Sequence, residues 1–514
     1  MEVVMSLHTL QPLSFIFLPL LLLIFLCTYT YTYSQKLPTY STHRPPSYPI
    51  IGCLISFYKN RGRLLDWYTQ LLAESPTNTI VVQRFGAPRT IVTANPDNVQ
   101  YILKTNFNNF PKGKPFTDLL GDFLGSGILN VDGELWYKQR KLASHEFSAR
   151  CLREYFMTSL EDEVERRFFP VLESLARTAE VVDLQELLRR LAFNVICKVS
   201  LGIDRCYLDP SQPDSVLAKA FDLASEICAR RGAAPLFIVW KVKRWLGVGS
   251  ERRLKEAIKE IHKHVAQMIQ EKKNKIEKGD TYSQDLLSRL ILADLEEKVI
   301  RDMVISFIMA GRDTTSAAMT WLFWLLSSHR HIEGEVVKEA TLANGRQLNY
   351  ESLKELRFLN ACLCESMRLY PPVAWDSKHA TVDDLLPDNT PVRAGDRVTY
   401  FPYGMGRMET IWGNDYLEFK PERWFLDSNE RSMKKVCPFK FPVFQAGPRV
   451  CLGKEMAVIQ MKYVMASILK RFEIRPISPE RPVFVPLLTA HMAGGLKVLI
   501  QRREAEMDQN ITLN

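Results

Sequence analysis

Near the C-terminal end, one cysteine lies in a segment whose residue types suit metal binding. The segment reads FQAGPRVCLG (444–453) and is followed by KEMAVIQMK, a run of good helix formers. The dipole at the start of such a helix would lower the pKa of the Cys451 thiol and favour the thiolate, the form that binds metals. The alternative is a buried structural cysteine beside a turn, the usual fate of an intracellular cysteine.

The segment resembles the haem-binding loop of cytochrome P450 monooxygenases. The resemblance implies a mainly α fold with a small β portion, preceded by an N-terminal transmembrane helix. It also implies that Cys451 binds the iron of haem b, with Phe444, Gly447 and Gly453 around the porphyrin and Arg449 paired with a haem propionate. An enzyme of this class is a haem-thiolate monooxygenase, which uses O2 and NADPH through a separate reductase.

A second motif indicates a structural network. Glu365 and Arg368 are three residues apart in an apolar-periodic helix, 359–369, so both charges share one helix face. A buried, unpaired charge there would cost about 3–5 kcal/mol, so a third partner is expected. Arg423, in the segment FKPERW (419–424), is the candidate for a Glu–Arg–Arg network behind the haem.

A polar island interrupts an otherwise apolar helix predicted from Glu296 to His329. The island reads AGRDTT (310–315), and Thr314 can bond back to the carbonyl of Ala310, which loosens the helix. By the resemblance, Ala310 borders the haem, and Asp313 and Thr314 deliver protons during oxygen activation. The alternative is a helix break or a Thr-rich N-cap.

Two further positions match cofactor-binding motifs of the resembled family. Trp136 and Arg140, at i and i+4 of a predicted helix, are expected to point at a haem propionate. The other propionate is expected to meet a cation just after the helix of Glu365. Either Lys378 or His379 could supply it, and His379 is the first candidate.

Composition fits a cytosolic catalytic domain with an acidic redox partner. The chain carries a net charge of +9, and its ten cysteines show no C-x-x-C spacing, so neither a zinc site nor a disulfide framework is indicated. The basic residues gather around the expected proximal side of the haem, which favours an NADPH–cytochrome P450 reductase over nucleic acid. Those residues are Lys138, Lys141, Arg431, Lys434, Lys435 and Lys440.

The N-terminus predicts a membrane anchor. Residues 13–33 carry no charge, and a helix of that length would span about 30 Å, one bilayer core. Glu2 precedes the run and Lys36 follows it, which predicts a lumenal N-terminus and a cytosolic domain at the endoplasmic reticulum. The expected organisation is an anchor at 1–36, one monooxygenase domain at 37–503 and a tail at 504–514. Hairpins are predicted at 79–94 and at 487–500.

Several segments resemble the plant group of ω-hydroxylases: FPKG (110–113), DLLGDFLG (118–125), QRKLASHEF (139–147), DSKHA (376–380) and FPYGMGRM (401–408). The resemblance implies a lipid substrate oxidised at its terminal carbon, either a sterol side chain or a long-chain fatty acid. A jasmonoyl–amino acid is the alternative. A substrate channel is expected to use Phe116, Leu120, Phe123, Ala374, Trp375, Leu488 and Thr489. The Ala374-Trp375 pair departs from the usual pattern of the group and favours a bulky sterol.

A different class of chemistry has to be weighed beside this one. A haem-thiolate isomerase or dehydratase rearranges lipid hydroperoxides without O2 or electrons. Such an enzyme would typically lack the pair formed by Asp313 and Thr314 and would have a distorted cysteine loop. Both features are intact here, which favours a monooxygenase.

Overall fold

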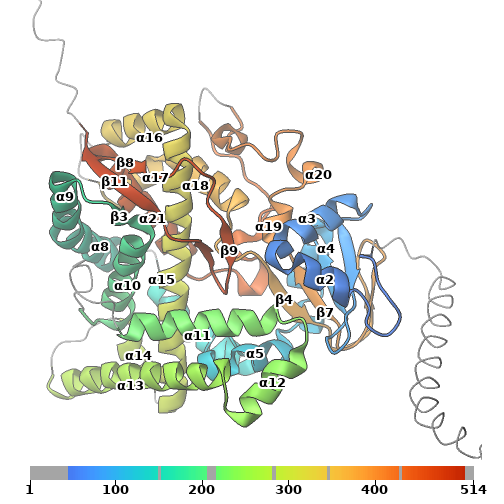
Figure 1. The fold of residues 1–514 in the computed structure, drawn as a ribbon. Helices are drawn as coiled ribbons and strands as arrows, with labels where there is room; N and C mark the ends of the chain where they lie inside the picture. Colours follow the sequence, from blue (N-terminus) through green and yellow to red (C-terminus); the bar gives the residue numbers. More distant parts are fainter. Residues whose placement is uncertain are drawn as a thin grey trace, which may run out of the picture.

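The structure is a computed structural model that describes residues 44–148, 152–204, 216–279, 285–293, 295–343, 348–427 and 431–503. Helices make up most of it and strands form a small part, as expected (Figure 1). Within these ranges no helix combines the length and apolarity needed to cross a membrane. The predicted anchor span, 13–33, and the predicted tail, 504–514, lie outside the described residues.

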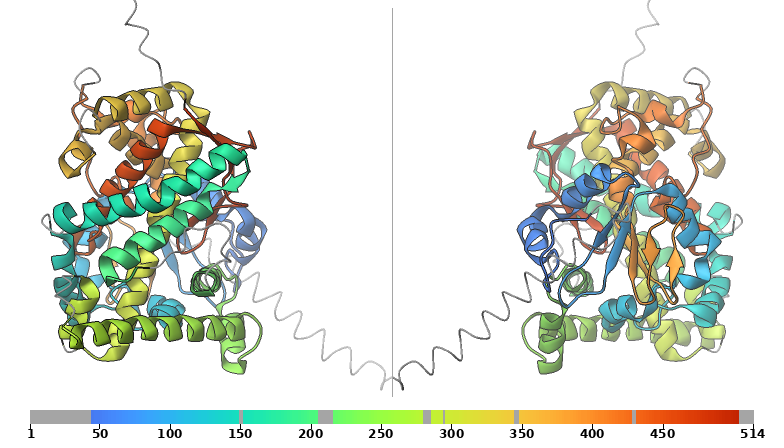
Figure 2. Two further views of the ribbon diagram at one scale, coloured as in Figure 1. Left: turned by 90° about the vertical axis from the view of Figure 1, so that its left-hand side faces the viewer. Right: turned by 90° about the vertical axis from the view of Figure 1, so that its right-hand side faces the viewer.

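The longest helix, α15, runs through the middle of the molecule (Figures 1 and 2). Its bounds, Glu297–Ser328, match the predicted helix closely, and most of its side chains are buried. Helix α15 packs closely against α10. The close approach is possible because Gly311 of α15 has no side chain, and any side chain there would collide with Ile196 of α10. A Cβ at that position would lie 2.6 Å from Ile196 Cδ1.

The other long helices surround α15. They are α3 (Leu64–Glu74), α5 (Gly113–Leu124), α6 (Gly133–Ser144), α9 (Phe169–Thr178), α10 (Leu184–Leu201), α11 (Val216–Gly232), α12 (Phe237–Leu246), α13 (Ser250–Glu277), α16 (Arg330–Leu342), α18 (Arg357–Leu369) and α21 (Lys454–Arg471). Shorter helices are α2 (Leu54–Asn60), α4 (Pro96–Gln100), α8 (Met157–Glu163), α14 (Leu286–Leu292), α17 (Tyr350–Glu355), α19 (Pro402–Met405) and α20 (Glu409–Trp412).

Within the described ranges the strands form four small sheets. The largest has the order β1-β2-β7-β4, and the others pair β9 with β10, β3 and β8 with β11, and β5 with β6. The strands are β1 (Thr79–Val82), β2 (Thr90–Thr93), β3 (Val182–Asp183), β4 (Asp376–His379), β5 (Asp384–Leu385), β6 (Pro391–Val392), β7 (Arg397–Tyr400), β8 (Phe472–Pro476), β9 (Phe484–Pro486), β10 (Ala490–Met492) and β11 (Lys497–Arg502).

One predicted hairpin is confirmed and the other is wrong. Strands β1 and β2 pair antiparallel, with Thr79 opposite Thr93. Strands β10 and β11 flank Gly494 and Gly495 but do not pair with each other. Instead β10 pairs with β9, and β11 pairs with β8 and β3. The glycine pair is therefore a corner between two sheets.

Among the residues that the structure describes, the buried apolar side chains form two clusters. The larger one surrounds α10, α15, α18 and α21, and the smaller one fills the space between the β1-β2-β7-β4 sheet and α2 and α3. In the right-hand view of Figure 2 this sheet faces the viewer at the outer side of the molecule. The candidate site lies between α15 and the loop that precedes α21, with residues from β4 and the chain before α5 near its edge.

Candidate active site

The cysteine loop holds Cys451 at the start of α21. Gly447–Arg449 form one turn of 3-10 helix, and the Cys451 amide donates a hydrogen bond to the Phe444 carbonyl, 2.8 Å away. The thiol faces a cavity, yet protein atoms enclose its other sides, and this burial raises its pKa. The Gly453 amide and the charges of Arg140 and Lys454 act in the opposite direction. The predicted lowering of the thiol pKa is therefore wrong, because burial outweighs the Gly453 amide and the two cations.

The two glycines of the loop differ in how closely other atoms approach the place where a Cβ would lie. Gly447 has a φ of +67°, and a Cβ there would lie 2.1 Å from the Leu103 carbonyl oxygen. Glycine is thus required by the neighbouring backbone at 103. A Cβ on Gly453 would make only an ordinary contact, 3.4 Å, with the Phe147 ring. Whether either glycine also makes room for a porphyrin stays a prediction.

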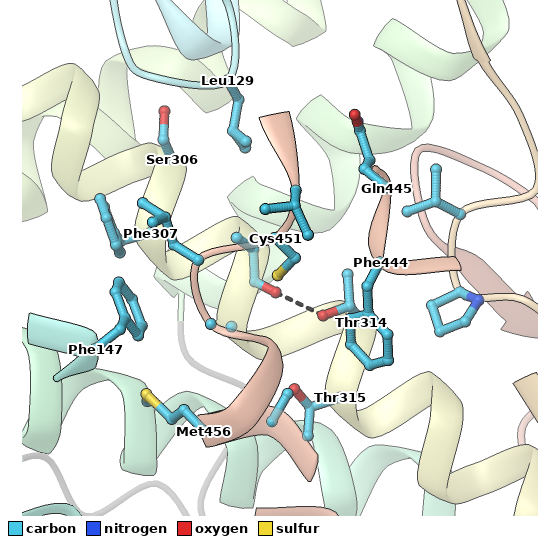
Figure 3. A pocket seen from close by; sticks show the side chains of 18 of the residues that line it. Leu129, Phe147, Ser306, Phe307, Thr314, Thr315, Phe444, Gln445, Cys451 and Met456 are labelled. Atoms are coloured by element: carbon cyan, nitrogen blue, oxygen red, sulfur yellow. Dashed lines mark hydrogen bonds between the residues drawn. The ribbon is translucent and has the colours of Figure 1, made fainter. Parts of the chain in front are cut away.

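The cavity has a volume of about 300 Å³ and is mostly lined by apolar side chains (Figure 3). The Phe147 and Phe307 rings stack on one wall, with centroids 6.2 Å apart. Of the residues selected from the sequence, Trp136, Arg140, Ala310, Thr314, Phe444, Arg449, Cys451 and Gly453 line it. Leu129, Phe147, Ser306, Phe307, Gln445 and Met456 also line it and were missed. The position of Phe307 could have been inferred from the sequence, because it lies one helical turn before Gly311 on α15 and therefore on the same face of the helix.

Thr314 and Asp313 point in different directions from α15. The Thr314 hydroxyl donates a hydrogen bond to the Ala310 carbonyl, 2.7 Å away, as predicted, and Thr314 lines the cavity (Figure 3). Asp313 is 4% exposed and does not line the cavity. Consecutive side chains on a helix are about 100° apart, so both cannot face one space. Their proton-delivery roles stay predictions.

Asp313 faces a buried ionic cluster between α10, α11 and α15. Its Oδ1 lies 3.6 Å from Arg312 Nε and 3.8 Å from Arg189 Nε, without a direct hydrogen bond to any described residue. Both arginines pair with Asp222 of α11, and the Arg312 pair measures 2.9 Å. These two arginines lower the pKa of Asp222 against the effect of its burial. Because the Asp222 side chain is 40% exposed, the cluster connects Asp313 with solvent.

Three cationic or aromatic residues form one edge of the cavity. The Arg449 guanidinium lies 4.5 Å from the Trp136 ring centroid and pairs with Asp132 at 2.6 Å. Arg140 donates a hydrogen bond to the Val450 carbonyl, 2.7 Å away. Trp136, Arg140 and Arg449, predicted to meet haem propionates, are thus brought together beside Cys451.

The two candidates after the helix of Glu365 lie outside the cavity lining. Lys378 Nζ pairs with Asp376 Oδ2 at 2.9 Å. The His379 Nδ1 lies 2.6 Å from the Lys112 carbonyl, and burial lowers the His379 pKa to about 4. At neutral pH His379 is therefore uncharged, with its Nδ1 proton donated to that carbonyl. Which of the two approaches a propionate stays a prediction.

Glu365, Arg368 and Arg423 lie together in a buried network. Arg368 donates two hydrogen bonds to the Glu365 carboxylate, at 2.7 and 2.8 Å, and Arg423 Nε donates one at 3.2 Å. Trp424 Nε1 and the Lys420 amide donate two more, at 2.9 and 3.1 Å. Glu365 and Arg368 are fully buried, so these bonds replace the water that both charges lost. The two additional donors were not anticipated.

The residues expected to line a substrate channel are buried or partly buried around the site. None of Phe116, Leu120, Phe123, Ala374, Trp375, Leu488 and Thr489 lines the cavity. Phe123 packs edge-on against Phe221, with centroids 5.6 Å apart, and Trp375 packs against Phe401, 6.1 Å away. Their channel roles stay predictions.

The comparisons with known proteins agree with this site. The family model Cytochrome P450 matches residues 43–492. The chain is 60% identical over 475 residues to Cytochrome P450 94B1 of Arabidopsis thaliana, an alignment that covers 91% of this chain and 93% of the relative. It is 59% identical to Cytochrome P450 94B3 of the same plant (91% and 94% covered) and 43% identical to Cytochrome P450 94A1 of Vicia sativa (90% and 91% covered).

The fold and the cysteine site define a haem-thiolate monooxygenase of the mainly α class. The chain belongs to the cytochrome P450 family. The residues present fit the haem of this family. Among the described cysteines only Cys451 lines the cavity, the walls are apolar, and cations stand at one edge to meet carboxylates. When bound, the haem supplies oxygen activation, with electrons from NADPH through a reductase.

Proposed function

We propose that the protein hydroxylates the terminal carbon of an amphipathic lipid that carries a carboxylate, either a long-chain fatty acid or a jasmonoyl–amino acid conjugate. The observation that carries this proposal is the likeness to the Cytochrome P450 94 relatives over at least 90% of this chain, together with the segments FPKG (110–113) and FPYGMGRM (401–408). A terminal methyl has the strongest C–H bonds of its chain, so its selection must be steric.

The sterol side chain has less support than the two acidic lipids. That case rested on Trp375, which was expected to reshape the channel over the haem. Trp375 packs against Phe401 in the smaller apolar cluster and does not line the cavity, so its expected contact with a substrate stays a prediction. Each buried methylene contributes about 0.8 kcal/mol, so a flexible acyl chain still gains affinity in a narrow space.

Product identification tests this proposal. Microsomes containing this protein and a reductase are given NADPH with fatty acids, jasmonoyl-isoleucine and hydroxylated cholesterol, and the products are identified by mass spectrometry. Microsomes with Cys451→Ser provide the matched control. Terminal alcohols of the acidic substrates are expected. Oxidation at ring or mid-chain positions of every substrate, or of the sterol alone, would contradict the proposal.

The proposed site roles follow the geometry. Thr314 and Asp313 would move protons toward the cavity, with the arginine cluster behind Asp313 as the connection to solvent. Trp136, Arg140 and Arg449 would bind haem propionates.

We also propose attachment to the endoplasmic reticulum membrane by residues 13–33, with the catalytic domain in the cytosol. Helix α12 supports a membrane-facing side, because it exposes apolar side chains next to basic ones. The apolar ones are Ile238, Val239, Val242 and Trp245, and the basic neighbours include Lys243 and Arg244. Trp245 is 84% exposed, which suits a membrane interface. Alkaline carbonate extraction of microsomes should leave the protein in the pellet, and release into the supernatant would argue against an anchor.

A further inference from the structure

A buried lysine at the edge of the cavity has no anionic partner of its own. Lys112 is 8% exposed, lines the cavity and precedes α5. Its ammonium lies 4.2 Å from the centroid of the Phe116 ring, but it forms no ion pair with any described residue. Burying a cation without a partner is costly, so the site calls for a negative charge.

The nearby carboxylates are already engaged by other groups. Asp376 accepts hydrogen bonds from Lys378 and Tyr400 at 2.9 and 3.0 Å, and from Gln445 at 2.8 Å. Asp132 accepts from Arg449 at 2.6 Å and from the amides of residues 112 and 113, each at 3.0 Å. Neither carboxylate is therefore directed at the Lys112 ammonium.

The charge balance around Lys112 points the same way. The charged groups that act on it are the cations Lys378 and Arg449 and the anions Asp376 and Asp132. Together with Lys112 this makes three positive and two negative charges, which leaves one positive charge uncompensated. Burial lowers the Lys112 pKa to about 7, the result expected when a cation is desolvated and its neighbours do not neutralise it.

The main chain of Lys112 is fixed on both sides. The Asp132 carboxylate holds its amide, and the His379 ring donates to its carbonyl over 2.6 Å. Asp132 in turn pairs with Arg449, two residues before Cys451. The ammonium is thus held at a set place relative to the cysteine loop, at the edge where Arg449 and Trp136 also meet the cavity.

We propose that Lys112 binds a carboxylate of the haem, as a propionate contact supplied from the segment before α5. A substrate carboxylate has the same chemistry but does not suit this place. Under the proposed function the oxidised carbon is at the far end of the lipid, so its carboxylate would lie away from the cysteine. Because Lys112 lines the cavity whereas His379 and Lys378 do not, and Lys378 is paired with Asp376, Lys112 is better placed than either to provide the charge.

Haem retention tests this inference without reliance on catalysis. The purified holoenzyme is mixed with excess apomyoglobin, and haem transfer is followed by the change in Soret absorbance. Lys112→Gln should lose haem at least about tenfold faster than wild type, the effect of one lost charge-assisted hydrogen bond. Lys112→Arg keeps the charge and should remain close to wild type. Lys114→Gln changes an exposed lysine two residues further on, and should match wild type.

Two further readouts separate the alternatives. The absorption band of the reduced carbon monoxide complex should be unchanged in Lys112→Gln, which verifies that the fold and the cysteine ligation persist. Spectral titration with dodecanoic acid and with 1-dodecanol should give affinities equal to those of wild type. Unchanged haem loss with weaker binding of the acid alone would assign Lys112 to substrate and overturn the inference. Equally fast haem loss in Lys112→Gln and Lys112→Arg would indicate packing and also overturn it. Neither result depends on which carbon is hydroxylated.

Discussion

Glu146 provides a test of the electrostatics beside the cavity. It is 4% exposed, immediately precedes the cavity-lining Phe147, and its Oε2 has no hydrogen-bond partner among the described residues. Arg289 Nη1 lies 3.8 Å away, which is too far for a direct hydrogen bond. The Glu146 pKa is raised from 4.5 to about 7, because the effect of burial outweighs the charge of Arg289, which lowers the pKa. The folded protein therefore binds this proton more tightly than the unfolded chain.

The sign of the effect on stability follows. The contribution of Glu146 is fully present below pH 4.5 and is lost as the pH rises to about 7, where the carboxylate ionises in the folded state. The difference between the two pKa values corresponds to about 3 kcal/mol. Glu146→Gln keeps the shape of the protonated side chain and cannot ionise. It should therefore be more stable than wild type above pH 7, by up to this amount, and should show little of that advantage below pH 5.

The assay is urea unfolding followed by tryptophan fluorescence at pH 5, 6, 7 and 8. The quantity compared is the free energy of unfolding of Glu146→Gln minus that of wild type, because titration of other groups cancels in the difference. Glu409→Gln, at an exposed carboxylate, serves as the control and should give a difference near zero throughout. A difference for Glu146→Gln that stays constant with pH, or falls as the pH rises, would refute the reasoning.

Four other outcomes are expected. Cys451→Ser should lose the long-wavelength band of the reduced carbon monoxide complex, and a retained band would remove the thiolate assignment. Thr314→Ala loses the hydrogen bond to the 310 carbonyl and should lower the ratio of product to NADPH consumed several-fold, with more hydrogen peroxide; unchanged coupling would exclude Thr314 from proton delivery. Reversing the charge of the exposed Lys434 and Lys435 should slow electron transfer from the reductase at low salt, and the deficit should shrink near 0.1 M salt, where the screening length is about 10 Å. Equal rates at low salt would contradict that surface. Glu365→Gln should reduce the yield of haem-containing protein, because removing the anion of a buried charge pair costs about 3–5 kcal/mol of stability. A yield equal to that of wild type would argue against a structural role.

The sequence was most informative where one segment determines its own structure. Helices α15 and α18 begin and end within about two residues of the predicted bounds, because long apolar periodicity identifies a buried helix. The contact of Thr314 with Ala310 was predictable for the same reason, since both residues lie on one helix. Local spacing also placed Glu365 next to Arg368.

Features that depend on distant segments could not be predicted in this way. The strands around Gly494 looked like one hairpin, but β10 pairs with the preceding β9, and β11 pairs with β8 and with the distant β3. The wall residue Leu129 carries no periodic signal, because it lies in the turn between α5 and α6. The surroundings of Lys112 depend on Asp132, Asp376 and Arg449, which come from three separate parts of the chain.

The network around Glu365 has a consequence for how this region can diverge. One carboxylate is shared by donors from α18 and from residues 420–424, and Arg368 also donates to the carbonyls of Tyr416 and Glu418. Loss of Glu365 leaves the buried Arg368 without a carboxylate partner among the described residues, while Arg423 keeps Asp415 at 2.6 Å, so a later loss of Arg368 adds little further penalty. Neutral drift at these positions would thus require coordinated replacement of several codons, and intermediate sequences would pass through a destabilised protein.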